Sequence, residues 1–277
     1  TFKQAGRWQA AAVDAPLPQE KWWQAFDDPV LDGLVEQVML DNQNLKQAEA
    51  RYRAARATLD SARSAFFPTV SLAATANRGN TAAAASVSTP ATTTYSLSAL
   101  ASWEIDVWGR IRRNVESADA NLAASAADLG AARLSTQALL AQTFIQMRAA
   151  EAQLDLLQRT IGAYGRFLEL TRNRFAAGVA SQLDVAQADT QLSNVEAQAI
   201  DAENQRAQFE HAIAVLVGRP PAVFAISTVG RLPSAPAIPE LIPSLVLEHR
   251  PDIAAAERRM AAANAQIGVA AAAYFPV

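Results

Sequence analysis

Proline is absent from Ala91 to Arg219, although five prolines precede this stretch and eight follow it. Because proline breaks the interior of a helix, very long helices can form here. Large apolar residues recur every seven positions, at Leu122 and Leu129 and then, after a shift of four, from Leu140 to Phe175. A heptad repeat with one interruption is typical of a long, gently supercoiled helix. The sequence therefore predicts a helix from Arg110 to Ala177, roughly 100 Å long at the usual helical rise.

A second apolar pattern follows Gly178 and predicts that the chain turns back on itself. Its members form two neighbouring rows, Val185, Leu192, Ala199 and Ile213 in one and Ala188, Val195, Ala202, Phe209 and Leu216 in the other. Arg206 is the one interruption of the first row. We expect the second helix to pack on the first as an antiparallel hairpin, with its tip from Arg174 to Val185.

Between Pro68 and Asp106 the apolar period becomes two, which predicts a pair of strands. The alternating residues are Val70, Leu72, Ala74 and Ala76 and, after a loop rich in Asn, Gly, Ala, Ser and Thr, Tyr95, Leu97, Ala99, Ala101 and Trp103. Tyr95 and Trp103 share a face and lie about 26 Å apart at strand rise. That spacing is close to the height of the apolar band between the aromatic girdles of an outer-membrane barrel. A soluble hairpin with two surface aromatics is the alternative, and in either case a lone strand pair needs partners.

An internal repeat links the two ends of the chain. LKQAEARYRAARATLDSARSAFFP, Leu45 to Pro68, returns in altered form as IAAAERRMAAANAQIGVAAAAYFP, Ile253 to Pro276, at a constant offset of 208 positions. The pairing matches Glu49 with Glu257 and Phe67 with Phe275. It predicts a duplicated protein, and we expect a second strand pair and a second helical hairpin to follow Val277 in the complete chain.

Composition excludes several classes of function. The formal charge of −3 and the isoelectric point near 5.5 leave no basic surface for nucleic acid. No run of 18 apolar residues exists, so no membrane-spanning helix is expected. The lack of cysteine excludes disulfides, thiol nucleophiles and cysteine-ligated metals. Much of the apolar half is alanine, which favours close, thin contacts between helices.

The segment EHRPD, Glu248 to Asp252, is the one place where acid, histidine and arginine crowd together. A metal or acid–base site would need a second convergent cluster, yet the other histidine, His211, lies within the heptad-like helix. We favour a structural role, with Arg250 or Asp252 fixing a helix end. No other segment resembles a nucleophile with its base, a phosphate loop or a ligand set, so we expect no catalytic, cofactor or metal site and no enzyme.

The motif WEIDVWGR, Trp103 to Arg110, joins the second strand to the long helix. Tryptophans at a strand end suit a membrane interface, and Glu104, Asp106 and Arg110 are expected to form salt bridges, with Asp106 near the helix N-cap. Short helices are expected from Leu31 to Leu40 and from Ser244 to His249. Asn44 is expected to cap the helix after the first of these.

Six segments resemble, in order, those of the TolC-like outer membrane factors, especially the lipoprotein-type efflux channels. They are WWQAFDDPVLDGLVEQVMLDNQNLKQAEAR, RSAFFPTVSL, SWEIDVWGRIRRNVESADA, RFAAGVASQLDVAQADTQL, LVGRPP and LIPSLVLEHRPDIAAAERRMAAANAQIGVAAAAYFP. The resemblance implies a mainly α fold with a small β part. It also implies a homotrimer in which each protomer gives four strands to one barrel in outer-membrane lipid and long helices to a periplasmic tunnel.

By the same resemblance, the protein is a passive channel in the outer membrane of a Gram-negative bacterium. It would work with a periplasmic adaptor and an inner-membrane transporter, and its cargo is not indicated. The lipid-bearing cysteine that the family carries near its mature N-terminus is absent from this sequence. A periplasmic adaptor and a coiled-coil scaffold are the rival classes. An adaptor should add a lipoyl-like domain, and a scaffold does not account for aromatics around alternating strands.

The resemblance divides the chain into six regions. They are an N-terminal extended segment of the equatorial region (1–30), a short helix and a tunnel helix (31–67), a β-hairpin of the barrel (68–105), a long helical hairpin with its periplasmic tip at 175–183 (106–218), an equatorial connector with a short helix (219–250) and the start of the second repeat (251–277).

Two sets of site residues follow from the resemblance. The expected adaptor-docking tip consists of Arg174, Gly178, Val179, Ala180, Ser181, Leu183 and Asp184. Gly178 permits a tight turn, and the small residues Ala180 and Ser181 let a partner hairpin approach; a plain helix turn is the alternative. The expected membrane-interface residues are Tyr95, Trp103 and Trp108.

Overall fold

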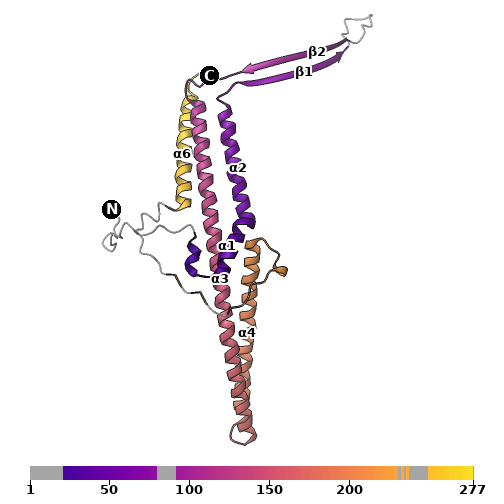
Figure 1. Ribbon diagram of the computed structural model, residues 1–277, viewed down its shortest axis with the longest axis vertical. Coiled ribbons are helices and arrows are strands. Elements are labelled where there is room, and N and C mark those ends of the chain that lie inside the picture. Colours follow the sequence, from indigo (N-terminus) through magenta and orange to yellow (C-terminus); the bar gives the residue numbers. More distant parts are fainter. Residues whose placement is uncertain (1–20, 80–91, 230–231, 234, 237–248, 277) are drawn as a thin grey trace, which may run out of the picture. The chain divides into compact units, whose positions relative to one another are not determined.

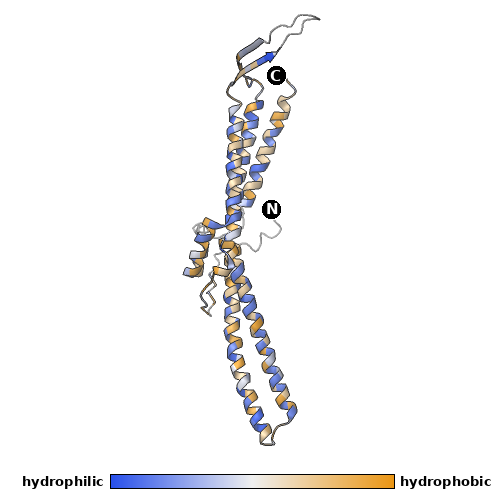
Figure 2. Ribbon diagram, turned by 90° about the vertical axis from the view of Figure 1, so that its right-hand side faces the viewer, coloured by the Kyte–Doolittle hydropathy of each residue, from blue (hydrophilic) through white to orange (hydrophobic). Residues whose placement is uncertain are grey.

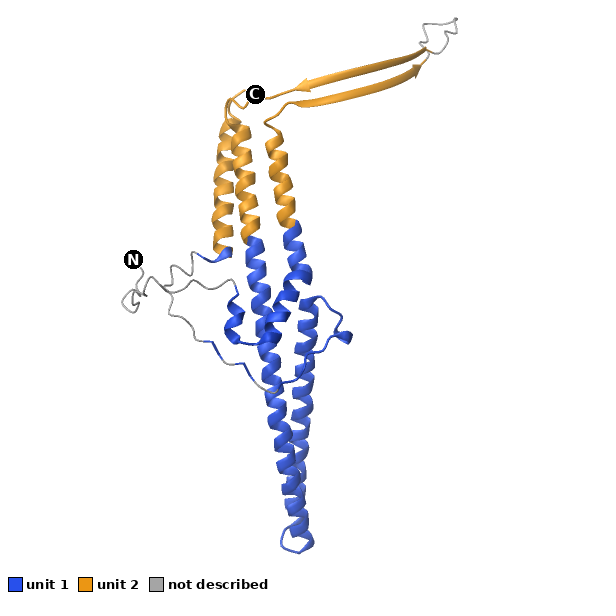
Figure 3. Cartoon of the chain, in the orientation of Figure 1, with its two compact units in different colours: residues 1–50, 128–251 blue, residues 51–127, 252–277 orange. Residues whose placement is uncertain are grey.

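The computed structural model describes residues 21–79, 92–229, 232–233, 235–236 and 249–276. The chain forms two compact units, one of residues 1–50 and 128–251 and one of residues 51–127 and 252–277 (Figure 3). Residues 244–248 of the predicted helix from Ser244 to His249 and most of the predicted N-terminal segment lie outside the described residues, and His249 lies in a turn.

The long helical hairpin is formed by α3, Arg110–Ala176, and α4, Gln182–Val217, which lie side by side below the middle of α3 (Figures 1 and 2). The predicted bounds of the long helix are therefore confirmed to within one residue. Every member of the two predicted rows on α4 is buried or half-buried. An ion pair of 3.2 Å between Arg172 and Asp189 joins the two helices near the tip, so the predicted antiparallel packing is confirmed.

The core of the first unit forms where α1, Pro29–Asp41, packs beside α3 and α4. Asp28 accepts hydrogen bonds from the N–H groups of Val30 and Leu31, and Pro29 occupies the first helical position, so the sequence fixes where α1 begins. The short 3₁₀ helix η2, Trp22–Phe26, adds aromatic rings to this core. The fully buried residues of this core include Leu31, Val35, Val38, Leu140, Phe144, Met147, Ile213 and Val217.

The prediction that Asn44 caps α2 is wrong. The helix spans Gln43–Ser64, and its cap is Asn42, whose Oδ1 accepts from the N–H groups of Asn44 and Leu45 at 2.9 and 3.1 Å. The Nδ2 of Asn42 also donates to the carbonyl of Leu216 on α4. This contact, distant in sequence, favours Asn42 over Asn44 because it satisfies a buried amide.

The second unit contains the strand pair β1, Thr69–Gly79, and β2, Thr92–Ser102. They pair antiparallel, with Leu72 opposite Ala99 and Ala76 opposite Tyr95. One face of the ribbon therefore carries Val70, Leu72, Ala74, Ala76, Tyr95, Leu97, Ala99 and Ala101. The other carries mainly Ser and Thr, with a hydrogen bond between the hydroxyls of Thr75 and Ser96. The predicted strand pair and its two faces are confirmed.

In the same unit, α3 contacts both α2 and α6, Pro251–Ala272. An Arg63 nitrogen lies 3.7 Å from an Asp119 oxygen, and Gln266 donates to the Ser117 hydroxyl at 2.8 Å. In the described part of the chain, no helix is both long enough and apolar enough to cross a bilayer. Figure 2 shows hydrophilic and hydrophobic residues interspersed along every helix.

Candidate functional site

The tip of the α3–α4 hairpin turns at a glycine in the left-handed backbone conformation, which residues with a Cβ rarely adopt. Gly178 has φ of 76°, and its N–H donates to the carbonyl of Phe175 at 2.9 Å. The N–H of Val179 donates to the carbonyl of Arg174, also at 2.9 Å. These two bonds form a Schellman motif, which satisfies the last carbonyls of α3. A Cβ at Gly178 would meet no described atom within 4 Å, so the requirement for glycine here is conformational.

The return helix starts with a reciprocal cap between Ser181 and Asp184. The Ser181 hydroxyl accepts from the N–H of Asp184, and the Asp184 carboxylate accepts from the Ser181 N–H and hydroxyl. The hydrogen bond from the Ser181 backbone, followed by that from its hydroxyl, lowers the pKa of Asp184 below its ordinary value of 3.8. These two of the seven predicted docking residues thus hold the turn in shape.

The remaining predicted tip residues shape the surface that the turn presents. Val179 and Leu183 are 73% and 64% exposed. Arg174, Val179, Ala180 and Asp184 line one groove of about 460 Å³ between the two helices. Phe167, Thr171, Gln187, Ala188 and Gln191 complete its lining. Sequence reasoning missed Phe167 and Gln187, although each directly adjoins a member of a predicted apolar row, Leu168 or Ala188.

The junction between β2 and α3 combines an ion pair with a helix cap. Arg110 donates two hydrogen bonds to Glu104 from Nη2, at 2.7 and 2.8 Å, and a third from Nε. Asp106 accepts from the N–H groups of Ile111 and Arg112 at 3.0 and 2.9 Å. Partial burial raises the pKa of Asp106, but the bonds from Arg112 and Ile111 outweigh it and leave the pKa below its usual value. The expected salt bridge and the expected capping role of Asp106 are both present.

The three predicted membrane-interface aromatics are exposed but do not share one environment. Tyr95 lies within β2, whereas Trp103 follows its last residue and donates from Nε1 to the carbonyl of Phe66 at 3.1 Å. Trp108 stacks on Phe275, with ring centroids 4.5 Å apart and planes 13° from parallel. Its Nε1 donates to the carbonyl of Pro276. Trp108 therefore joins the first strand-to-helix junction to the end of the second repeated segment, Ile253 to Pro276.

A buried ionic network, not foreseen from the sequence, ties the chain after α4 to the long hairpin. Glu151 accepts from Arg148 at 2.8 Å and from Arg206 at 3.1 Å, and its side chain is fully buried. Arg148 also donates to the carbonyl of Ser227, and Arg206 donates to that of Ile226. Arg206, the polar interruption of a predicted row, thus has a buried ionic role.

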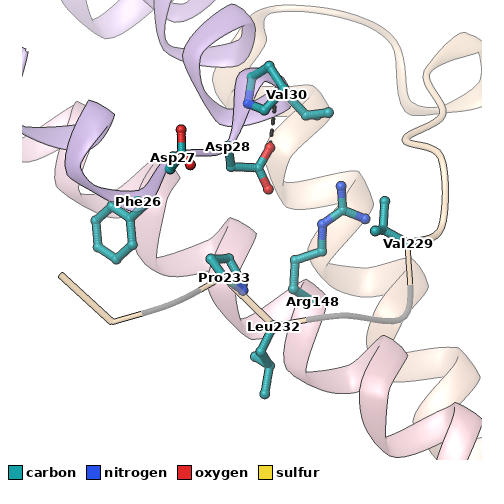
Figure 4. Close-up of a pocket in the computed structure, with 9 residues that line it drawn as sticks. Phe26, Asp27, Asp28, Val30, Arg148, Val229, Leu232 and Pro233 are labelled. Atoms are coloured by element: carbon teal, nitrogen blue, oxygen red, sulfur yellow. Dashed lines mark hydrogen bonds between the residues drawn. The ribbon is translucent and has the colours of Figure 1, made fainter.

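Beside this network, the Arg148 guanidinium reaches a pocket of about 340 Å³, where it lies between Asp28 and Val229 (Figure 4). Among the described residues, its Nη2 makes no hydrogen bond. Through the bonds from Arg148 and Arg206 to the carbonyls of Ser227 and Ile226, this network holds the segment after α4 against the hairpin.

The histidine-containing segment does not assemble a site among the described residues. His249 lies in an exposed turn before α6, and His211 is exposed on α4. Asp252 lies in the first turn of α6, where a carboxylate complements the helix dipole. No cluster of three or more His, Cys, Asp or Glu side chains suited to a metal ion occurs in the part of the chain that the structure describes.

A family model and the most similar curated proteins agree on one family. The model of the outer membrane efflux protein family matches residues 34–219. The pyoverdine export outer membrane protein OpmQ of Pseudomonas putida KT2440 is 34% identical, over 97% of this chain and 59% of its own length. The toluene efflux pump outer membrane protein TtgF of P. putida DOT-T1E is also 34% identical, over 92% of this chain and 54% of its own length.

Solved structures give the same result. The outer-membrane channel OprN superposes with a TM-score of 0.82 and 36% identity, over 92% of this chain and 58% of its own. The outer membrane protein VceC of Vibrio cholerae gives a TM-score of 0.79 and 25% identity, over 94% of this chain and 62% of its own. The chain thus spans less than two thirds of the length of these relatives.

Proposed function

Because the chain belongs to the outer membrane efflux protein family, we propose that it is part of the channel subunit of a tripartite efflux pump. The complete protein forms a homotrimer in the outer membrane of a Gram-negative bacterium and conducts its cargo passively. An inner-membrane transporter supplies the energy through a periplasmic adaptor. The proposal rests on one observation. A single chain that belongs to a family of efflux proteins combines a strand pair with an apolar and a polar face and a long helical hairpin.

The strand pair supports a place in a trimeric barrel. Its apolar face, from Val70 to Ala76 and from Tyr95 to Ala101, suits lipid, and its Ser/Thr face suits a water-filled lumen. Both outer edges must pair with further strands in a bilayer, because lipid offers backbone groups no hydrogen bonds. In this arrangement Tyr95, Trp103 and Trp108 lie at the membrane interfaces, where the polar atoms of exposed aromatic side chains reach water.

The hairpin tip is the proposed adaptor-docking site. Val179 and Leu183 present apolar side chains to solvent, and the neighbouring Ala180 and Ser181 are small enough for close approach by a helical hairpin. Gly178 and the Ser181–Asp184 cap keep the turn rigid, so docking does not have to order it. Arg174 and Asp184 line the groove between the helices and provide polar partners.

Conduction requires no chemical step, and we assign no catalytic residue, cofactor or metal. The names of two relatives that are each 34% identical to this chain mention different cargoes, pyoverdine for OpmQ and toluene for TtgF. Identity at this level therefore does not assign a cargo to this protein. In a passive channel, selection by the inner-membrane transporter accounts for such variety.

Fractionation of the complete protein tests the proposed location and assembly. It should appear in the outer-membrane fraction as a trimer that resists detergent, and it should restore resistance to a strain lacking its own channel when expressed with the adaptor and transporter of its organism. Recovery in the soluble periplasmic fraction would instead favour an adaptor or a scaffold.

A matched pair of variants tests the docking tip. Leu183→Glu places a charge on the exposed apolar tip and should abolish resistance while leaving the trimer intact. Gln198→Glu introduces the same charge at an exposed position several turns along α4 and should leave resistance unchanged. Equal resistance in the two strains would rule out docking through Leu183.

A further inference from the structure

The pocket beside the buried ionic network contains one hydrogen-bond donor that the network does not use. The Arg148 side chain is 1% exposed, and its Nη1 donates to Glu151 and to the carbonyl of Ser227, both at 2.8 Å. Its Nη2 is buried and has no hydrogen-bond partner among the described residues. Because an unpaired buried donor is costly, above all on a charged group, this nitrogen indicates that a further group binds in the pocket.

The carboxylates of the network are already engaged with other donors. One oxygen of Glu151 accepts from Arg206, and the other accepts from Arg148 and from a backbone N–H. Both oxygens of Glu210 accept from Arg206. Two arginines and two glutamates also cancel in formal charge, so the network as a whole does not attract a counterion into the pocket.

Asp28, at the start of α1, lines the same pocket as Arg148 (Figure 4). Its Oδ1 caps the helix by accepting from the N–H groups of Val30 and Leu31. In the part of the chain that the structure describes, Oδ2 accepts no hydrogen bond, and the two side chains form no ion pair. The pocket therefore offers an unpaired donor from α3 and an unpaired acceptor from α1.

The remaining walls of the pocket are mainly apolar. They are formed by Phe26, Pro29, Val30, Val229, Leu232 and Pro233. The volume of about 340 Å³ is within the range of small-molecule sites. The walls come from the entry to α1, from α3 and from the segment after α4, so a molecule bound here would contact all three.

The charges around the pocket restrict its ligand. An anion would lie beside the carboxylates of Asp27 and Asp28, and a cation would meet the buried guanidinium of Arg148; both arrangements place like charges together. A neutral group that accepts and also donates avoids both costs. We propose that the pocket binds a small neutral molecule whose carboxamide oxygen accepts from Nη2 of Arg148 and whose amide nitrogen donates to Oδ2 of Asp28. An apolar body attached to the amide packs against Phe26 and Leu232. This site does not depend on the proposed channel function.

Fluorine NMR of the complete protein, purified as a trimer, tests the pocket with three probes of one shape. The probes are ring-fluorinated phenylacetamide, phenylacetate and phenethylamine, which are neutral, negative and positive at neutral pH. The signal of the amide should shift and broaden on binding, and the two charged probes should bind at least about tenfold more weakly. Bound amide should also slow proteolysis near Ser227, because a ligand stabilises the folded segments that it contacts.

Two variants locate the binding. Leu232→Trp places a larger side chain at the pocket wall, and Arg148→Lys removes Nη2 while keeping a positive charge beside Glu151. Each should weaken binding of the amide by about tenfold or more. Val223→Trp is the matched control, since Val223 is exposed, also follows α4 and does not line this pocket. It should bind the amide as the unmodified protein does.

Tighter binding of either charged probe than of the amide would overturn the assignment of a neutral ligand. Equal binding of the amide by Leu232→Trp and the unmodified protein, or binding by neither, would show that the pocket holds only water. If Arg148→Lys does not assemble, Leu232→Trp and the charged probes decide the question. Trimer assembly and drug resistance are measured separately, so a failure of the pocket proposal would leave the proposed function standing.

Discussion

Ser181 and Asp184 exchange hydrogen bonds in both directions at the start of α4, from the Ser181 N–H to the carboxylate at 2.8 Å and from the Asp184 N–H to the hydroxyl at 3.2 Å. These reciprocal bonds satisfy backbone N–H groups that have no partner within the first turn of a helix. Both residues are exposed, so hydrogen bonds rather than a buried core hold the turn in shape.

Ser181→Ala should loosen the first turn of α4. Removing an N-cap hydroxyl costs about 1 kcal/mol of helix stability, so backbone amides from Gln182 to Val185 should exchange several-fold faster with solvent. Ser193→Ala, at an exposed position within α4, is the control and should leave exchange unchanged or slower. Equal exchange in the two variants would show that the cap contributes nothing.

Asp184 should make the tip sensitive to acid. Its pKa is lower in the folded protein than the ordinary value of 3.8, so the carboxylate stabilises the cap above that value. This stability falls as pH decreases through the folded pKa, because protonation removes the acceptor. Amide exchange at the tip should be insensitive to pH from 7 to about 5, after correction for intrinsic rates, and protection should be lost below 3.8. Asp184→Asn should remove this dependence.

Gly178 should tolerate asparagine better than leucine. The left-handed backbone costs a branched or bulky residue roughly 1–2 kcal/mol, whereas asparagine adopts it more readily. Gly178→Leu should abolish efflux without dissociating the trimer, and Gly178→Asn should retain most of it. Both can be measured as minimum inhibitory concentrations beside an unheated denaturing gel. Unchanged resistance with leucine would show that the turn's shape does not matter for docking.

Glu151→Gln should destabilise the first unit far more than the same change on the surface. It removes the charge that balances Arg148 and Arg206 in a buried site, and such a loss costs about 3–5 kcal/mol. Limited proteolysis should then cut faster near Ser227, whose carbonyl Arg148 holds. Glu196→Gln, exposed on α4, should change neither stability nor cleavage. Similar results for both would mean that the network is energetically neutral.

Gly218→Ala should lower the stability of the first unit for two reasons. Gly218 has φ of 76°, and an added Cβ would lie 2.9 Å from the carbonyl oxygen of Asp41. We expect a loss of about 1–3 kcal/mol in the free energy of unfolding, measured by denaturant titration. Gly33→Ala is the control, since it lies within α1 with no described atom near the new Cβ, and it should stabilise by about 0.5–1 kcal/mol.

The periodic parts of the fold could be predicted from the sequence. The heptad from Leu140 and the proline-free stretch locate α3 to within one residue, and alternation locates β1 and β2 with their faces. These patterns succeed because each depends on which side of one element is buried. At the junction, Asp106 and Glu104 follow from the same local reasoning, since helix caps and short-range ion pairs are formed by neighbours in sequence.

The contacts between distant segments could not be predicted in this way. The choice of Asn42 over Asn44 depends on Leu216, which is remote in sequence. Arg148 and Glu151 resemble any solvent-exposed pair on a helix, and nothing local indicates that the chain at Ser227 covers them. The stacking of Trp108 on Phe275 was also missed, although the repeat had already singled out Phe275. The docking and interface residues remain predictions.

The strand pair also bears on when the protein folds. Every residue of β1 and β2 is exposed, and a single hairpin of this kind is at best marginally stable in water. If neighbouring copies supply the missing strands, hairpin formation becomes a concentration-dependent step coupled to association. Until that association, the chain would carry unpaired, partly apolar strand edges, which are prone to pair with other exposed strands.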